Sequence, residues 1–209
     1  MAGRGKVWRG EVWRGMARQG EARFLGTGGR MIETVECKIT GLSALLMHAY
    51  PLVPVEAIEK KTPEQQAEFS AYRHPETREL YLPAIALQRA LVAGAAYSKG
   101  KGRANLVKPT AACLQIDGEY LRLGTKEYTI DSRPVVIPAT KGRVLRHRPR
   151  IDRWSVTFTL SYDDTLLSAK QVRQIVDDTG KNVGVLDFRP EKKGPFGRFI
   201  VDAWRDGGN

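Results

Sequence analysis

The sequence has few cysteines and histidines and no long apolar run. Only Cys37 and Cys113 occur, outside any Cys/His cluster, so no zinc ligand set is present and we expect no metal or organic cofactor. Two isolated cysteines are typical of reduced thiols in a cytoplasmic protein, although sequence alone leaves a disulfide open. No stretch approaches the roughly 18 apolar residues of a membrane helix, and no apolar segment follows the basic N-terminus as in a signal peptide. These absences predict a cytoplasmic protein with no membrane partner.

Positive charge is abundant and unevenly placed. The 209 residues carry a net charge of +11, and 42% of them are hydrophobic, enough for a folded core. Residues 1–30, 99–108, 141–153 and 189–198 carry net charges of +5, +4, +5 and +3, so the remainder of the chain is negative. Such concentration favours a polyanionic partner, RNA or single-stranded DNA, over the alternative of an evenly solvated surface.

Residues 1–30 differ in composition from the rest of the chain. They are rich in Gly and Arg and contain a short repeat, Lys6-Val-Trp-Arg-Gly10 followed by Glu11-Val-Trp-Arg-Gly15, without a sustained helical or strand period. We interpret them as a flexible basic tail. The alternative is that Met31 is the natural start and residues 1–30 are a non-native extension. Residues 31–209 are expected to form a single domain.

From Glu33 onward the patterning predicts an α+β fold. Strands are expected at 33–41, 110–116, 128–130, 135–137, 154–162, 183–186 and 198–204, with a β-hairpin at 70–82. Helices are expected from Pro83 to about Tyr97 and over 169–178, the second with Ser168 as N-cap and Gly180 as C-cap. This order matches an RRM-like or ferredoxin-like βαββαβ core with inserted β-hairpins. The basic segments fall in its connections.

The strongest local feature is the glycine-rich, basic segment 183–199. Glycines let a backbone approach a ligand closely, Lys and Arg neutralise phosphate, and phenylalanine rings stack on bases. The segment contains neither a Walker A motif nor a GxGxxG loop. The alternative is a long basic hairpin with two core phenylalanines. The candidate nucleic-acid-binding residues are Phe188, Arg189, Lys192, Lys193, Gly194, Phe196, Gly197 and Arg198.

Two further basic segments supply candidate phosphate ligands. An extended arm over 141–153 would place alternate arginines on one side, where they follow several phosphates; the alternative is a charged edge strand that resists aggregation. The segment after the first helix puts cations where a helix C-terminus favours them in any case. The candidates are Lys141, Arg143, Arg146, His147, Arg148 and Arg150 in the arm, and Lys99, Lys101 and Arg103 after the helix. Binding requires these segments to converge into one groove.

Two stretches resemble a known family. The ending Gly194-Pro-Phe-Gly-Arg-Phe199, preceded by Gly184 and basic residues, resembles the C-terminal glycine-rich loop of the RAMP superfamily of CRISPR-associated proteins. Residues 82–94 resemble the helix that RAMP backbone subunits place after a hydrophobic-Pro-Gly-Ser step, except that Ala84 and Ile85 replace Gly and Ser. Residues 31–204, with a Gly-Leu-Ser-Ala-Leu-Leu-Met-His opening, also resemble small uncharacterised phage and prophage proteins. The RAMP resemblance covers about a third of the chain.

The RAMP resemblance implies an RRM-like fold and a role in antiviral defence. It implies binding of guide RNA or another single strand, and assembly with further copies or other subunits of a ribonucleoprotein. Some RAMP members are metal-independent endoribonucleases with a histidine base, a role for which His48 is the candidate. Because His48 stands in an apolar stretch, we interpret it as a core or structural residue and expect a non-catalytic binder. A third hypothesis is a phage structural or assembly protein with an acidic partner.

Overall fold

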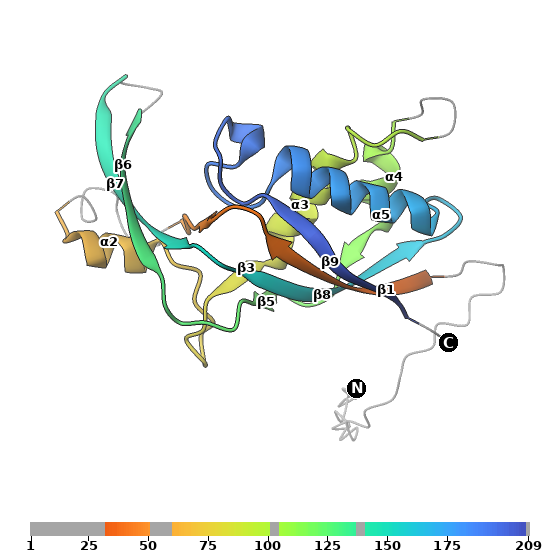
Figure 1. Cartoon of the computed structure of the whole chain (residues 1–209), viewed down its shortest axis with the longest axis horizontal. Helices are drawn as coiled ribbons and strands as arrows, with labels where there is room; N and C mark the ends of the chain where they lie inside the picture. The colour runs from red at the N-terminus through yellow and green to blue at the C-terminus, as the bar shows by residue number, and fades with distance from the viewer. Residues whose placement is uncertain (1–31, 51–59, 101–104, 137–140, 208–209) are drawn as a thin grey trace, which may run out of the picture.

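The computed structural model describes residues 32–50, 60–100, 105–136 and 141–207 as a four-stranded sheet with helices on one face and a projecting arm (Figure 1). The predicted tail at 1–30 lies outside these residues. The elements are β1 (Ile32–Gly41), β2 (Leu45–Leu46), α2 (Pro63–Phe69), β3 (Tyr81–Pro83), α3 (Ala84–Gly94), α4 (Val107–Cys113), β4 (Gln115–Ile116), β5 (Tyr120–Arg122), β6 (Thr129–Val136), β7 (Arg143–Ile151), β8 (Ser155–Asp163), α5 (Ala169–Asp178), the π-helical turn η2 (Thr179–Val183), the 3-10 turn η3 (Pro190–Lys192) and β9 (Phe199–Asp206).

The main sheet has the strand order β4-β8-β1-β9, and every neighbouring pair is antiparallel. Helix α3 lies on the path from β1 to β4, and α5 connects β8 to β9. In each of these β-α-β units another strand lies between the two that the helix joins, which is the split βαβ arrangement of the ferredoxin-like fold. The predicted α+β class and βαββαβ core are confirmed.

Alternating residues of β1 and β8 build the core. Cys37 and Ile39 are buried on the same face as their partners Phe158 and Val156, because strand side chains alternate between the two faces of a sheet. The amphipathic helix α5 covers this face with residues such as Ile175, whose full burial is worth roughly 2 kcal/mol. The strongly periodic strand over 154–162 and the helix over 169–178 are therefore confirmed.

Three expected details are wrong. Gly180 does not end α5, because the chain continues into η2 and turns only at Gly184, whose φ is 72°. Residues 110–113 belong to α4, so the strand expected at 110–116 is reduced to β4. The strand expected at 183–186 is a looped segment without strand pairing.

The insertions form two small sheets. Strands β6 and β7 pair along their length, and β2 joins β7 to give the order β2-β7-β6. The strands expected at 128–130 and 135–137 overlap β6, and residue 137 lies outside the described residues. In the expected hairpin at 70–82 a single bridge joins Arg73 to Leu80, while β3 pairs with β5. The basic segment 141–153 is thus mostly strand β7 and not a connection.

Candidate nucleic-acid interface

The antiparallel pair β6–β7, called the arm below, projects from the main sheet (Figure 1). Its register places Arg146 opposite Arg133 and Arg148 opposite Asp131, so these four side chains share one face with Arg150. His147 lies on the other face, where its Nδ1 is 2.7 Å from Ser132 Oγ. Helix α2 packs against β7. The expected alternation of the arginines is therefore present.

Residues 184–198, called the glycine-rich loop, are folded back on themselves. Gly197 has a φ of 70°, and a Cβ at this position would lie 2.0 Å from the carbonyl oxygen of Val185. A Cβ on Gly194 would lie 1.8 Å from the carbonyl oxygen of Phe188. Both glycines are buried, and their N–H groups donate to Ala44 and Arg189. Both N–H groups are therefore used within the protein, and the tight packing of the loop, not the approach of a ligand, requires glycine at 194 and 197.

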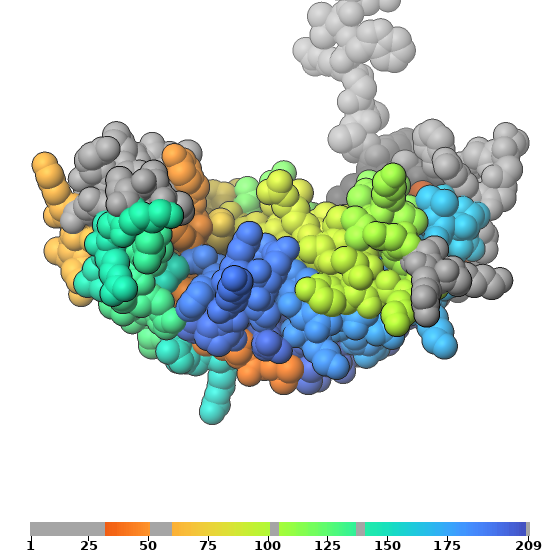
Figure 2. All heavy atoms as spheres, turned by 90° about the horizontal axis from the view of Figure 1, so that it is seen from above, coloured from red at the N-terminus to blue at the C-terminus, as the bar shows by residue number. Residues whose placement is uncertain are grey.

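The arm and the glycine-rich loop meet. Arg148 forms an ion pair with Asp187, and the guanidinium carbon of Arg133 lies 4.8 Å from the centre of the Phe196 ring and 5.5 Å from that of Phe188. Cation–π contacts of this kind are each worth about 0.5–2 kcal/mol. Figure 2 shows the loop in blue between the green arm and the yellow-green α3–α4 region. Two basic segments that are distant in sequence therefore form one surface.

This contact changes the expected roles of two residues. Phe196 is only 6% exposed and packs against Arg133, so its ring is not available for stacking on a base. Arg148 is 5% exposed and neutralises Asp187 instead of a phosphate. Both residues fix the arm to the loop. Phe188 is half-buried and is held with φ at 45°.

Several of the other candidate cations remain exposed. Lys141 and Arg143 stand at the end of the arm, and Lys192 and Lys193 at the outer part of the loop; within the described residues none of the four forms an ion pair. The remaining candidates are more constrained: Arg146 is half-buried, Arg150 pairs with Asp152 at 2.7 Å, Arg189 pairs with Glu191, and Arg198 donates to the Lys181 carbonyl at 2.9 Å.

The third basic segment does not join this surface in the same way. The α3–α4 connection that carries Lys99 lies on the other side of the loop from the arm (Figure 1). Lys99 is exposed, and its backbone forms an isolated antiparallel β-bridge with Asn105. Lys101 and Arg103 lie outside the described residues.

A small polar cavity of about 290 Å³ lies where the loop meets α3 and the segment after β2. His48 lines it and is 46% exposed at its side chain, which corrects the expectation of a core histidine. Its Nδ1 lies 3.5 Å from Oδ2 of Asp187. Burial by itself would raise the pKa of Asp187, but the hydrogen bond from His48 and the charge of Arg148 outweigh it and lower this pKa to about 2. Asp187 is therefore ionised at neutral pH.

Three polar residues of this cavity were not predicted from the sequence: Tyr72, Arg89 and Asp187. Arg89 could have been identified as a candidate from the sequence, because it is a cation outside the apolar face of the predicted helix. Asp187 could also have been identified, because it is a carboxylate within a basic segment. The position of Tyr72 beside them follows from the packing of segments that are distant in sequence, which local pattern does not reveal.

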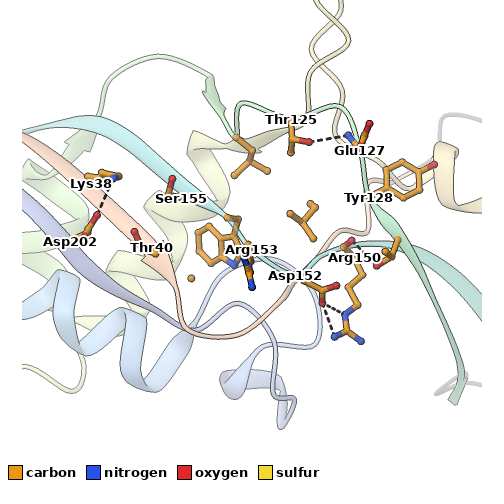
Figure 3. A pocket seen from close by; sticks show the side chains of 15 residues that line it. Lys38, Thr40, Thr125, Glu127, Tyr128, Arg150, Asp152, Arg153, Ser155 and Asp202 are labelled. Atoms are coloured by element: carbon orange, nitrogen blue, oxygen red, sulfur yellow. Dashed lines mark hydrogen bonds and ion pairs between the residues drawn. The ribbon is translucent and has the colours of Figure 1, made fainter.

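A larger cavity of about 730 Å³ lies on the helix-free face of the sheet (Figure 3). Its charges are largely matched, because Lys38 pairs with Asp202 at 3.0 Å and Arg150 pairs with Asp152. Arg153 is exposed and has no ion-pair partner among the described residues. This cavity is thus far less basic than the arm and the loop.

The described part of the chain contains neither a metal-ligand cluster nor a helix suited to span a membrane. None of its His, Cys, Asp and Glu side chains form a group of three or more that could hold a metal ion. None of its helices is both long and apolar enough to cross a bilayer.

Comparison with known proteins adds a fold likeness. No family model and no curated protein matches the chain. The chain is similar to one in the cryo-EM structure of the Type III-B Cmr-beta bound to cognate target RNA, with a TM-score of 0.52 and 11% sequence identity. The match covers 84% of this chain and 60% of the other, so this chain spans less than two thirds of its neighbour's length. At this identity the likeness is one of fold.

Proposed function

We propose that this protein binds single-stranded nucleic acid, RNA in particular, along the surface formed by the arm and the glycine-rich loop. The observation that carries the proposal is the contact between these two segments, which joins the strand that begins at Arg143 to the loop that carries Lys192 and Lys193. Clustered cations of this kind attract phosphates and release counterions. Other subunits of a ribonucleoprotein, including further copies of this chain, are the partners we propose.

The composition of the sheet supports this location. RRM-type sheets stack bases on aromatic rings of their open face. Apart from Ile32 at the start of β1, the outward residues of the two central strands are charged or hydroxylic, as at Lys38, Thr157 and Thr159, and none of the outward residues of β1 and β8 is aromatic. The arm and loop therefore offer the more suitable surface. The RAMP resemblance and the RNA-bound fold neighbour are consistent with this choice.

Fluorescence anisotropy with a labelled 20-nucleotide RNA tests the proposal. Binding should weaken as NaCl rises, with a log–log slope near −0.7 per phosphate contact, or about −3 for four contacts. Single-stranded RNA should bind more tightly than a duplex of equal length. Absence of binding to every nucleic acid at 50 mM NaCl would contradict the proposal and favour an assembly protein with an acidic partner.

One observation favours a second candidate function, a metal-independent endoribonuclease. His48 is exposed, faces the Asp187 carboxylate and shares its cavity with Arg89 and Arg189. If Nδ1–H donates to Asp187, Nε2 is free to take the proton of a ribose 2′-hydroxyl as its oxygen attacks the adjacent phosphate. The bond from that phosphate to the 5′-oxygen then breaks, the departing oxygen takes a proton from water, and the products end in a 2′,3′-cyclic phosphate and a 5′-hydroxyl.

Incubation of 5′-labelled RNA with the protein in EDTA tests this activity. Cleavage should fall by about 100-fold or more in His48→Ala, in line with the usual contribution of a general base. His74→Ala is the matched control, since the His74 ring accepts a turn N–H from Glu76 at 3.3 Å and does not line the cavity. Equal activity of the two variants would exclude His48 as the base.

A further inference from the structure

The cavity beside the glycine-rich loop has features that phosphate binding does not require. At about 290 Å³ it is close to the lower end of the roughly 300–1,000 Å³ of small-molecule sites, a size suited to one planar ring system. The side chains of His48 and Tyr72 line it, and both present rings. It also contains a carboxylate, which repels phosphate. A neutral, planar ligand with hydrogen-bond donors fits this chemistry better than an anion.

The carboxylate of Asp187 is fixed and partly open. Arg148 and His48 both approach Oδ2, and the backbone N–H of Phe188 also donates to the carboxylate. The backbone N–H of Asp187 donates to Leu46 at 3.0 Å, which anchors the residue against β2. The side chain is 30% exposed. An ionised carboxylate only accepts hydrogen bonds and has about four acceptor sites, so its exposed part can also accept a hydrogen bond from a donor on a ligand.

The two arginines of the cavity differ in how they are held. Arg189 donates to the Leu186 carbonyl at 2.9 Å and pairs with Glu191, so its guanidinium is committed. Arg89 is exposed on α3 and, within the described residues, pairs with no carboxylate. The cavity thus presents a partly exposed acceptor at Asp187 and an exposed, planar donor at Arg89.

We propose that this cavity receives one base turned out of the bound strand and that it selects guanine. The proposal rests on the single-strand binding proposed above. Guanine carries N–H donors at N1 and N2 for Asp187, and acceptors at O6 and N7 of the kind that arginine binds in two-point contacts. Uracil places two carbonyl oxygens beside its one N–H, so a carboxylate repels it. Base extrusion into a protein pocket costs little when the strand is unpaired.

Competition binding of four labelled RNAs tests the preference. Each is a 15-nucleotide uridine strand, either unchanged or with one central G, A or C. The strand with G should bind about tenfold more tightly than U15, as one two-point contact typically discriminates, and A and C should give smaller gains. Equal affinity for all four overturns this inference while leaving the proposed function standing. Failure of U15 itself to bind at 50 mM NaCl overturns the proposed function.

Two variants separate base selection from general folding effects. Arg89→Gln removes an exposed side chain without an internal carboxylate partner and should reduce the preference for G to about twofold. The double variant Arg148→Met with Asp187→Asn removes both members of the buried pair together, so neither charge is left unpaired. It should lose the preference for G, measured as the ratio of the affinities for the G strand and for U15, so that any change common to all strands, which is expected because this pair also holds the arm to the loop, cancels. Retention of the full preference in both variants overturns the assignment.

Discussion

A variant in which Lys141, Arg143, Lys192 and Lys193 are all replaced by serine is expected to bind single-stranded RNA about 100- to 1,000-fold more weakly at 0.1 M salt. Each cation that neutralises a phosphate of a single strand contributes about 0.7 to the log–log salt slope, so the slope should also become shallower by about 3. Because all four side chains are exposed and take part in no ion pair among the described residues, the fold should be unaffected. Anisotropy titrations at several NaCl concentrations measure both quantities.

The matched control removes the same amount of charge from other elements. Replacing Lys108, Lys126, Lys170 and Arg205 by serine also lowers the net charge by four, and all four residues are exposed. This control should lose affinity only several-fold, through the general field of the protein. Equal losses in the two variants would show that total charge, and not the surface of the arm and the loop, determines binding.

The second large effect is the contribution of the Asp187–Arg148 ion pair to folding stability and its loss at low pH. The folded pKa of Asp187, about 2, lies below its ordinary value of 3.8, so its ion pair stabilises the fold above pH 4 and this contribution is lost as pH falls through 2. The shift corresponds to about 2 kcal/mol. Asp187→Asn leaves Arg148 buried without its carboxylate and should lower the free energy of unfolding at pH 7 by about 2–4 kcal/mol. The loss of stability between pH 4 and pH 2 should be correspondingly smaller in this variant.

Urea unfolding followed by tryptophan fluorescence between pH 7 and pH 2 measures this effect. Asp164→Asn is the control, because Asp164 is exposed and should change the unfolding free energy by less than about 0.5 kcal/mol. The double variant with Arg148→Met should recover most of the loss. Wild-type stability in Asp187→Asn at pH 7 would contradict the importance of this pair.

The core could be predicted from sequence where the apolar residues repeat with one clear period, either that of a strand or that of a helix. The alternation through Val156, Phe158 and Leu160, and the helical spacing of Val172, Ile175 and Val176, gave the correct elements because burial of one face decides both. Residues 110–116 were misassigned because Thr110, Leu114 and Ile116 fall on one side of an alternating pattern, which is also typical of a strand. In the structure Pro109 lies in the first turn of a helix, where its missing N–H costs little, and Thr110 donates to the Leu106 carbonyl at 2.7 Å.

The site could be predicted only in part, because charge is readable from sequence and pairing is not. Clusters of Lys and Arg located the arm and the loop. They could not show that Arg148 is neutralised by Asp187, which lies 39 residues further along the chain. Nor could glycine spacing show that Gly194 and Gly197 serve the packing of the loop. Contacts between distant segments depend on tertiary structure, and local pattern carries no information about them.

The irregularity in β9 affects how copies of this protein meet. Opposite Lys38 and Ile39 the register of β9 shifts, which leaves Asp202 as an extra residue paired with Lys38. A bulge with a charged side chain on an outer strand twists that edge and interrupts its row of backbone hydrogen-bonding groups. A neighbouring molecule therefore cannot extend the sheet by adding a continuous strand here, and end-to-end stacking of sheets into fibres is disfavoured. Contacts between copies at the β9 edge would therefore have to be made by side chains.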